Sequence, residues 1–312
     1  MMRNINVVFA SDDNYAQHVT VAMASILLNT YHPERIHFYI LSDKITSINC
    51  KNIKDTVLSF RGKITFINVD SDDFQVFVSG HINKAAYLRL QIADLLPTSI
   101  EKAIYFDSDL VVLDDIEKLW NISIQGKPIG AVCDYGIMAS KKMQKQKHET
   151  IGLLRGDKYF NSGVIVFDLA QWRERKLGIS VMKCISHNKF RHHDQDALNM
   201  VFMHDWYELP LCWNVIPPIF EFPLKILVNK RLRKKSAQVL KNPSVFHWAG
   251  CCKPWQFPDK GNFTKLYYIY LNQILHVNDN IPQLKKNIKT TRKIIHKEFC
   301  MRMAVLWSKI FS

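Results

Sequence analysis

Two aspartates, two residues apart, follow a short apolar run in the segment KAIYFDSDLVVLDD, residues 102–115. Because side chains i and i+2 of an extended strand point the same way, Asp107 and Asp109 can present their oxygens to one ion. Carboxylate oxygens suit Mg²⁺ or Mn²⁺, and such an ion can neutralise a diphosphate leaving group. A strand end and turn with solvated aspartates remains the alternative, because D-x-D alone is a short motif.

A second group of candidate residues stands in FHWAGCCKPW, residues 246–255. A neutral His247 imidazole could complete a coordination shell, and nitrogen beside oxygen favours Mn²⁺. Gly250 permits close backbone approach, and Lys253 carries a point charge that could hold a phosphate. The simpler interpretations are a core histidine, a turn glycine and a surface lysine.

A third group, Asp12, Asp13 and Asn14, follows the first apolar run. Helix capping explains these residue types well. The functional alternative is that Asp12 accepts a hydrogen bond from the base of a nucleotide and Asn14 accepts one from the ribose. A G-x-G-x-x-G loop is missing here, which argues against NAD binding and against a P-loop enzyme.

The elements that must position these groups alternate between strand and helix. The expected strands are 5–10, 35–43, 63–70, 102–109 and 128–134, and the expected helices are 16–30, 48–60 and 84–97. Farther along, 159–175 is expected as loop, strand and helix start, a helix begins near residue 194, and 244–250 is a strand running into a loop. This alternation predicts a mainly parallel sheet with helices on both faces, whose ligands bind beyond the carboxyl ends of the strands.

Composition limits the function classes. The chain has 312 residues, 47% of them hydrophobic and 22% charged, as in a globular protein with a real core. The net charge of +14 favours an anionic partner. The seven cysteines have irregular spacing without a C-x-x-C pair, which indicates a reducing compartment. With no signal-peptide pattern and no apolar stretch of bilayer length, the expected location is the cytoplasm.

Several segments, taken together and in order, resemble glycosyltransferase family 8, and above all its bacterial lipooligosaccharide and lipopolysaccharide galactosyltransferases and glucosyltransferases. They are FASDDNY, AAYLRL, YFDSDLVVL, YFNSGVIVFDL, HDQDALN and FHWAGCCKPW, from about residue 5 to about residue 257. The resemblance implies a GT-A fold, which is a Rossmann-like nucleotide-sugar-binding α/β fold with a mixed sheet flanked by helices. It also implies Mn²⁺, with Mg²⁺ as the other candidate, and retaining transfer of a hexose from a UDP-sugar.

The resemblance also implies roles for individual positions. Asp107, Asp109 and His247 match metal ligands, whereas Ala10, Ser11, Asp12, Asn14, Arg89, Ser108, Asn161, Gly250 and Lys253 match donor-binding residues. Asp194 and Gln195 match residues at the reacting hexose, and His81 and Asp134 fall where acceptor contacts are expected. The simpler alternatives are a solvated Arg89, a turn at Asn161 and a helix N-cap at Asp194. The chain departs from the family pattern at Ser108 and at Cys251-Cys252.

Retention of configuration constrains the chemistry. It requires attack from the face that the leaving group departs, or two inversions with a nucleophile on the opposite face. The amide oxygen of Gln195 is a poor nucleophile, and Asp194 is a candidate nucleophile that is expected to hydrogen-bond the sugar hydroxyls instead. Front-face transfer through an oxocarbenium-like state is therefore favoured. In that scheme the departing UDP β-phosphate helps to deprotonate the acceptor hydroxyl, and Gln195 lends a dipole.

Residues 1–283 are expected to form the catalytic domain, with the donor site mostly in 5–165 and acceptor and closing elements in 166–258. Residues 284–312 are basic and amphipathic, and they are expected to bind an anionic membrane surface, with Phe299, Met303, Leu306 and Trp307 as apolar contacts. A helix packed on its own domain is the alternative. The expected partners are UDP-galactose or UDP-glucose and a lipid-linked oligosaccharide, at the inner face of a bacterial inner membrane.

Two other function classes remain as alternatives. A metal-dependent phosphohydrolase also uses D-x-D after a strand, but Leu110 and Val111 follow here in place of the polar residues expected there. A nucleic-acid binder is suggested by the net charge alone, and no nucleic-acid-binding module is recognisable. The choice between galactose and glucose depends on the stereochemistry of one hydroxyl, which residue order does not reveal.

Overall fold

The computed structural model describes residues 4–69, 85–188, 190–221, 236, 238–256, 261–277, 292–293 and 295–303. The strands are β1 (Ile5–Asp12), β2 (Ile36–Asp43), β3 (Lys63–Asn68), β4 (Lys102–Phe106), β5 (Leu110–Val112), β6 (Ile129–Cys133), β7 (Phe160–Asp168), β8 (Tyr207–Leu209) and β9 (Val245–His247). The α-helices are α1 (Ala16–Asn29), α2 (Ser47–Ser59), α3 (Ala85–Leu88), α4 (Ile92–Leu95), α5 (Ile116–Trp120), α6 (Tyr135–Met138), α7 (Lys141–Ile151), α8 (Leu169–Glu174), α9 (Leu177–His187), α10 (His193–Val201), α11 (Pro218–Glu221) and α13 (Asn262–Leu271). The 3₁₀ helices are η1 (Asp13–Tyr15), η2 (Pro33–Arg35), η4 (Arg89–Gln91), η5 (Leu211–Asn214) and η7 (Pro254–Gln256).

The central sheet has seven strands in the order β3-β2-β1-β4-β7-β6-β8. Strand β1 is parallel to β2 and β4, but β7 is antiparallel to both β4 and β6. The chain from β6 through α6 and α7 stays at the edge where β6 ends, so β7 starts there and runs back. Strand β8 is parallel to β6, so four of the six strand pairings are parallel and β7 alone runs against the other strands. The mainly parallel prediction is therefore confirmed apart from β7, and the mixed sheet expected from the resemblance is confirmed as well.

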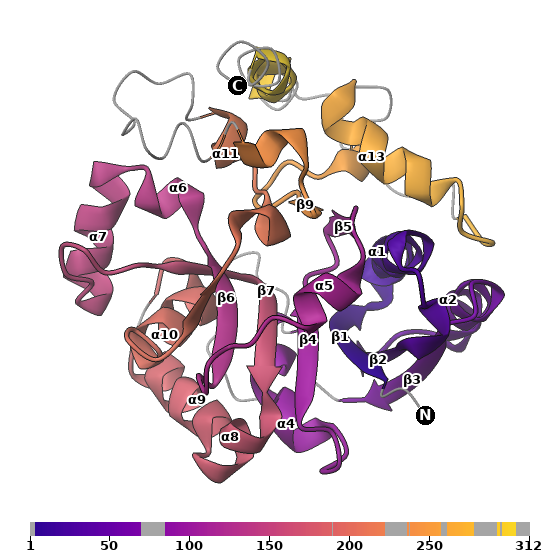
Figure 1. Cartoon of the computed structure of the whole chain (residues 1–312), viewed down its shortest axis with the longest axis horizontal. Helices are drawn as coiled ribbons and strands as arrows, with labels where there is room; N and C mark the ends of the chain where they lie inside the picture. The colour runs from indigo at the N-terminus through magenta and orange to yellow at the C-terminus, as the bar shows by residue number, and fades with distance from the viewer. Residues whose placement is uncertain are drawn as a thin grey trace.

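Helices cover both faces of the sheet, as predicted (Figure 1). Alternate side chains of a strand enter opposite layers. In β1, Val7 and Phe9 pack with residues of α1 and α2, whereas Val8 joins the layer that holds residues of α4, α8, α9 and α10. In β4, Phe106 packs in the layer of α1 and α2, whereas Tyr105 packs in the opposite layer. The sheet therefore lies between two apolar layers.

A second, two-stranded sheet lies beyond the carboxyl end of β4. Its strands β5 and β9 are antiparallel, with Leu110 opposite His247. The backbone N–H of Trp248 donates to the carbonyl oxygen of Asp109 at 2.9 Å. This pairing brings the segment after β4 beside a segment that is distant in the sequence.

Three element boundaries differ from the sequence prediction. The strand expected over 102–109 ends at Phe106, because the chain bends out of the central sheet to pair with β9 as β5. The helix expected over 84–97 is divided into α3, η4 and α4. Residues 161–163, expected in a loop, belong to the first part of β7. Asp107 and Asp109 therefore lie in a bend, and their spacing in a strand is not what makes them converge.

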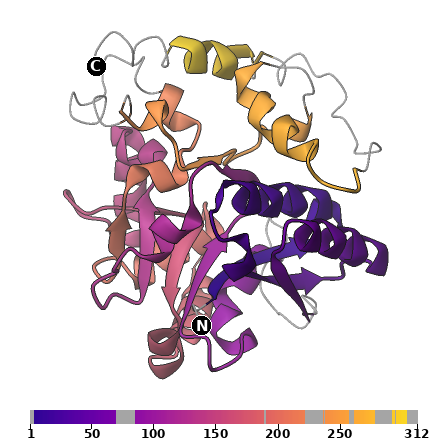
Figure 2. The same cartoon turned by 45° about the vertical axis from the view of Figure 1, so that its right-hand side comes forward.

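The described part of the C-terminal region is helical over residues 295–303 and lies beside α13 in both views (Figures 1 and 2). On its inner side Glu298 accepts a hydrogen bond from the backbone N–H of Phe263 at 2.8 Å, and Cys300 is buried. The large apolar residues on its exposed side are Ile295, Phe299 and Met303. Residues 225–241 are rich in lysine and arginine, and most of them lie outside the described residues, as do residues 284–291, Leu306 and Trp307. Within the described chain, no helix combines the length and apolarity needed to cross a bilayer.

Candidate active site

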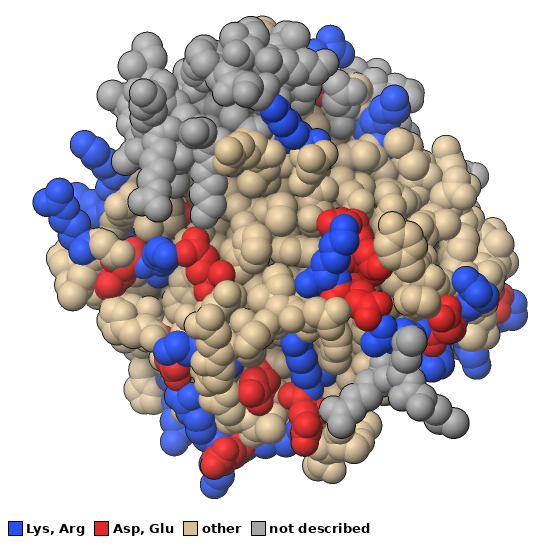
Figure 3. Space-filling model, viewed as in Figure 1, with Lys and Arg blue, Asp and Glu red and all other residues tan. Residues whose placement is uncertain are grey.

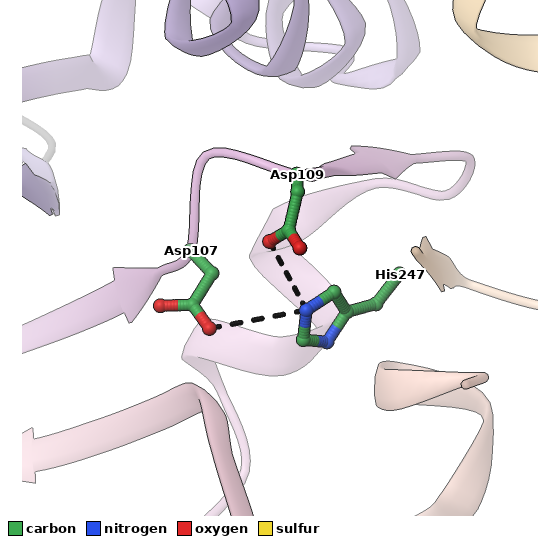
Figure 4. Close-up of side chains that lie close together, drawn as sticks. All are labelled: Asp107, Asp109 and His247. Atoms are coloured by element: carbon green, nitrogen blue, oxygen red, sulfur yellow. Dashed lines mark ion pairs between the residues drawn. The ribbon is translucent and has the colours of Figure 1, made fainter. Parts of the chain in front are cut away.

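Two carboxylates and an imidazole converge at the carboxyl end of the sheet. Asp107 and Asp109 come from the link between β4 and β5, and His247 ends β9 (Figure 4). His247 Nε2 lies 3.1 Å from Asp109 Oδ1 and 3.8 Å from Asp107 Oδ2. One ligand atom from each residue lies within 4.8 Å of the other two, so these atoms can share one ion.

The ring of His247 is held in one orientation from behind. His247 is buried, and its Nδ1 lies 2.9 Å from Asn214 Oδ1. Asn214 in turn donates from Nδ2 to Asn161 Oδ1 at 2.8 Å. His247 Nδ1–H therefore donates to Asn214, which leaves the Nε2 lone pair directed at the two carboxylates.

Gly163 leaves the space that the three ligands need. A Cβ added at Gly163 would lie 2.4 Å from His247 Cε1 and 2.9 Å from Asp107 Oδ2. Any side chain there would displace a ligand. Two carboxylate oxygens and one imidazole nitrogen around such a space fit Mn²⁺, and also Mg²⁺ with a weaker match to nitrogen.

A lysine keeps one of the carboxylates ionised. Burial alone would raise the pKa of Asp109, but its charged neighbours, Lys253 first among them, outweigh burial and hold this pKa well below its usual range. Lys253 forms an ion pair with Asp109 Oδ2 and donates to the carbonyl oxygen of Trp248 at 3.1 Å. Burial would lower the pKa of Lys253, but Asp109 outweighs burial and raises this pKa above its ordinary value. Both groups are therefore charged at neutral pH.

Arg89 is buried beside the other carboxylate, so the solvated alternative is wrong. Its guanidinium Nη2 lies 2.9 Å from Asp107 Oδ1, and Nη1 donates to the carbonyl oxygen of Ser162 at 2.8 Å. The guanidinium carbon stands 4.6 Å from the ring centroid of Tyr105, whose hydroxyl donates to Asp107 Oδ1 at 2.9 Å. Burial would lower the pKa of Arg89, but Asp107 outweighs it and raises that pKa.

Asp194 places an acceptor oxygen next to Arg89. Helix α10 begins at His193, so Asp194 lies inside the helix and the N-cap alternative is wrong. Arg89 Nε is 3.3 Å from Asp194 Oδ2, an ion pair without hydrogen-bond geometry. In the described chain this buried oxygen has no hydrogen-bond donor, and burial raises the pKa of Asp194. This oxygen therefore keeps an unused acceptor position.

Gln195 and Asp134 share a network at the start of β7. Gln195 Oε1 accepts from the backbone N–H of Ser162 at 3.1 Å, and Gln195 Nε2 donates to Asp134 Oδ2 at 3.2 Å. Asn161 Nδ2 also donates to Asp134 Oδ2 at 3.2 Å, and Asn161 Oδ1 accepts from Gly163 N–H at 2.9 Å. Asn161 is therefore a strand residue that organises this network, and the turn alternative is wrong.

The segment expected to bind the nucleotide lies at the ends of β1 and β4. Asp12 caps η1 by accepting from the backbone N–H of Tyr15 at 3.1 Å, so the capping interpretation applies to it. Asn14 is exposed, and Ser108 Oγ donates to the carbonyl oxygen of Ala10 at 3.5 Å. Ser11 is the remaining predicted member of this segment and is buried. The hydrogen bond from Ser108, which follows Asp107 in the chain, joins the link after β4 to the end of β1.

The loop after β9 carries Gly250 in the left-handed region, at φ 97°, where glycine is favoured. It leads to Lys253 and then to Trp255, whose ring stacks on His18 at 3.6 Å between centroids. His81 lies outside the described residues, so its acceptor role stays a prediction. In the view of Figure 3, acidic and basic side chains meet near the middle of the face, with largely uncharged residues around them.

Sequence reasoning missed several residues that build this site. Asn214 stands in a segment without any motif, and its role depends on a contact across the fold. Tyr105 opens the YFDSDLVVL segment, and its spacing of two residues from Asp107 was the available signal. Asp196 was within the HDQD segment, two residues from Asp194, and that spacing was the available signal. Gly163 stands in the YFNSG segment, where its small size was the only hint.

Known proteins resemble most of this chain. The signature of glycosyl transferase family 8 matches residues 6–258. General stress protein A of Bacillus subtilis is 33% identical over 86% of this chain and 93% of its own length. Lipopolysaccharide 1,2-glucosyltransferase of Escherichia coli K12 is 26% identical over 94% of this chain and 85% of its own. The crystal structure of the galactosyltransferase LgtC with donor and acceptor sugar analogs matches with a TM-score of 0.77 and 26% identity, over 88% of this chain and 98% of that one. By its sequence signature and its GT-A-like fold, the chain belongs to glycosyl transferase family 8.

Proposed function

We propose that this protein transfers galactose or glucose from a UDP-sugar to a lipooligosaccharide- or lipopolysaccharide-type glycan, with retention of configuration. The convergence of Asp107, Asp109 and His247 carries the proposal, because such a ligand set beside two fixed cations suits a sugar diphosphate. When bound there, Mn²⁺ or Mg²⁺ would neutralise the diphosphate and ease its departure. Membership in family 8 favours this transferase over the phosphohydrolase and nucleic-acid alternatives.

The residues around the metal ligands have separate tasks in this proposal. Lys253 and the backbone at Gly250 hold the diphosphate, since this lysine is charged and the glycine leaves the backbone open. Asp12, Asn14 and the backbone at Ser108 hold the uridine. Arg89 fixes Asp107 and the phosphate side of the site.

The hexose lies against α10 in this proposal. The buried Asp194 Oδ2, which lacks a hydrogen bond in the described chain, accepts one from a sugar hydroxyl. Gln195 contributes the dipole of its amide, and Asp134 is the candidate contact for the acceptor. Because Asp134 is buried and already binds Gln195 and Asn161, it can couple acceptor binding to the orientation of Gln195.

Front-face transfer is favoured further by the surroundings of Asp196. This carboxylate would be the remaining nucleophile on α10 for a double displacement. Its Oδ1 pairs with Lys147 and accepts from Tyr159 OH at 2.6 Å, and its Oδ2 accepts from the backbone N–H of His192 at 2.9 Å. A carboxylate engaged at both oxygens and fully buried is a poor nucleophile.

The deciding experiment incubates the protein with Mn²⁺ and a panel of UDP-sugars and measures UDP release with and without lipid-linked oligosaccharide acceptors. We expect acceptor-dependent UDP release with one hexose and retention in the product, and release about a thousandfold slower from an Asp107→Ala/Asp109→Ala variant. Hydrolysis of simple phosphate esters without UDP-sugar turnover would instead support the phosphohydrolase.

We also propose that the C-terminal region attaches the enzyme peripherally to an anionic membrane at its cytoplasmic face. Residues 295–303 pack on α13 through one side, and the opposite side exposes Ile295, Phe299 and Met303, spaced four apart on one helical face. Arg292, Lys293 and Lys297 add positive charge next to this apolar stripe.

A variant with serine at Ile295, Phe299 and Met303 tests the attachment without uncovering Cys300. Its binding to vesicles rich in anionic lipid should fall clearly below that of the wild type in a sedimentation assay. Ile179→Ser, which makes one such change at an exposed isoleucine outside this helix, is the control and should bind normally. Equal sedimentation of the triple variant and the wild type would reject membrane attachment by this helix.

A further inference from the structure

A charged cluster with no access to solvent lies behind Gln195. Lys147 of α7, Tyr159 before β7 and Asp196 of α10 are each fully buried. Lys147 Nζ pairs with Asp196 Oδ1, lies 2.6 Å from His192 Nδ1, and stands 5.1 Å from the ring centroid of Tyr159. We call Lys147, Tyr159 and Asp196 the sealed cluster. Burying an ion pair costs desolvation energy, so its presence calls for a reason beyond stability.

In the sealed cluster the hydroxyl of Tyr159 donates its hydrogen bond and Asp196 accepts it. Burial raises the pKa of Tyr159, and Asp196 raises it further, so the phenol stays protonated. Burial would raise the pKa of Asp196, but its hydrogen bonds to Lys147 and Tyr159 outweigh this and lower it. The single Tyr159 proton therefore goes to Asp196 Oδ1, at 2.6 Å.

Together with the carboxylate of Asp134, the direction of that bond determines the orientation of the neighbouring amide. Gln195 Nε2 lies 3.2 Å from Tyr159 OH. Because the phenol proton is committed to Asp196, the phenol oxygen can only accept, and the Gln195 NH₂ group must donate to it. The Gln195 carbonyl oxygen is then turned toward Ser162 N–H, 3.1 Å away. With the amide flipped, its oxygen would face the oxygen of Tyr159 and the carboxylate of Asp134.

We propose that the sealed cluster is a positioning device, in which Lys147 and Asp196 orient the hydroxyl of Tyr159 so that Gln195 keeps its carbonyl oxygen toward Ser162. Tyr159, Asp196 and Lys147 are positioning residues, since they act through Gln195. This rests on the proposed function for the role of Gln195 in transfer, but the orientation itself can be measured separately. A merely structural cluster would join α7 to α10 without coupling to Gln195.

A double-mutant cycle between Tyr159→Phe and Gln195→Ala tests the coupling in the full-length enzyme. Losing one hydrogen bond that orients Gln195 should lower kcat about tenfold in Tyr159→Phe, while the Kd for UDP stays the same. In the Gln195→Ala background the same change should have no further effect on kcat. Tyr270→Phe is the matched control, since its hydroxyl accepts from Asn29 Nδ2 at 2.7 Å away from the site, and its kcat should be normal.

Two results would overturn the positioning role: a normal kcat in Tyr159→Phe, or a loss that adds fully to that of Gln195→Ala. Should Tyr159→Phe fold poorly, Asp196→Asn removes the charge that orients the phenol and should show the same dependence on Gln195.

An independent measurement covers the case in which no UDP-sugar is turned over. The ¹⁵N side-chain amide signals of Gln195, identified by their loss in Gln195→Ala, should shift and broaden in Tyr159→Phe. Unchanged signals would reject the inference, whereas absent transfer by the wild type would reject only the proposed function.

Discussion

The sealed cluster and the metal-ligand site use the same residue types for opposite purposes. In the ligand site, which comprises Asp107, Asp109 and His247, the Asp107 side chain keeps 23% of its surface exposed. In the sealed cluster the Lys147 and Asp196 side chains are 0% exposed. Both contain anions next to a lysine, but only the ligand site faces solvent from which a cation can enter.

The difference lies in how the negative charge is balanced. At the ligand site two carboxylates converge on one space. Arg89 and Lys253 each pair with the carboxylate oxygen that does not face His247. In the sealed cluster one carboxylate meets one lysine, a phenol and a backbone N–H, so both of its oxygens are bound by the protein. A cluster of acids indicates a ligand site where carboxylate oxygens converge on an open space, and an internal support where the protein satisfies them itself.

The largest expected effect breaks the ligand site. Asp107→Ala/Asp109→Ala should lower kcat about a thousandfold, because the several kcal/mol that a bound cation contributes would be lost. Mn²⁺ should raise the Tm of the wild type and leave that of the variant unchanged. Steady-state transfer assays and thermal unfolding with added metal check both results. Undiminished activity of the variant in chelated buffer would contradict the assignment of these ligands.

The second prediction breaks the sealed cluster. Lys147→Met leaves the Asp196 carboxylate buried without its cation, which should lower the free energy of unfolding by about 3–5 kcal/mol. Lys145→Met is the matched control on the same helix, since Lys145 is 80% exposed, and should change stability by less than about 0.5 kcal/mol. Urea unfolding measures both. Equal stability of the two variants would show that the buried pair is dispensable.

A third, smaller effect comes from crowding the ligand site without changing a ligand. In Gly163→Ala the new methyl group would press on His247 and Asp107, so metal affinity and kcat should each fall about 10- to 100-fold. Gly130→Ala is the control: its Cβ would meet Ile124 Cγ2 at 2.7 Å, which is similar crowding against a side chain away from the ligands. Metal titration of both variants decides. Identical metal affinities would mean that Gly163 does not shape the site.

The smallest expected effect is on the pH dependence of stability, and it comes from a buried histidine near the ligand site. His18 is buried, its Nδ1 lies 2.7 Å from Tyr267 OH, and burial lowers the pKa of His18 to about 3. Below the ordinary histidine pKa of about 6.5, His18 is protonated in the unfolded chain but stays neutral in the folded protein. The stability contribution of the neutral ring is therefore complete above that pH and is lost as the pH falls toward 3.

Between those limits His18 should make the free energy of unfolding fall by about 1.4 kcal/mol per pH unit. Urea unfolding of the wild type and of His18→Gln, compared at about pH 7 and about pH 5, isolates this contribution. The glutamine variant should lose less stability over this interval than the wild type does. The same pH dependence in both proteins would mean that His18 takes up its proton while the protein is folded.

Local patterns predicted much of the fold because they depend on neighbours in the chain. The alternation of Val7, Val8 and Phe9 between two apolar layers follows from the period of a strand. The D-x-D pair was found because both aspartates follow one strand. The prediction that both aspartates lie in one strand was wrong, because the chain bends after Phe106 to pair with β9.

The sealed cluster escaped prediction for a related reason. Lys147 stands in the basic segment KKMQKQKHETI of α7, where nothing separates it from the exposed lysines around it. The ring of His192 and the carboxylate of Asp196 reach it only because α7 packs against α10. Whether a lysine is solvated or buried depends on helix packing, which has no local signature.

By itself the sequence determined the chemistry at hand: the carboxylate pair, the late histidine and lysine, and the strand ends that present them. The tertiary structure decided which of these charges face a shared space and which are neutralised inside the protein. Residue types and periodicity act over a few positions, whereas desolvation and pairing of charges depend on atoms brought together from distant parts of the chain.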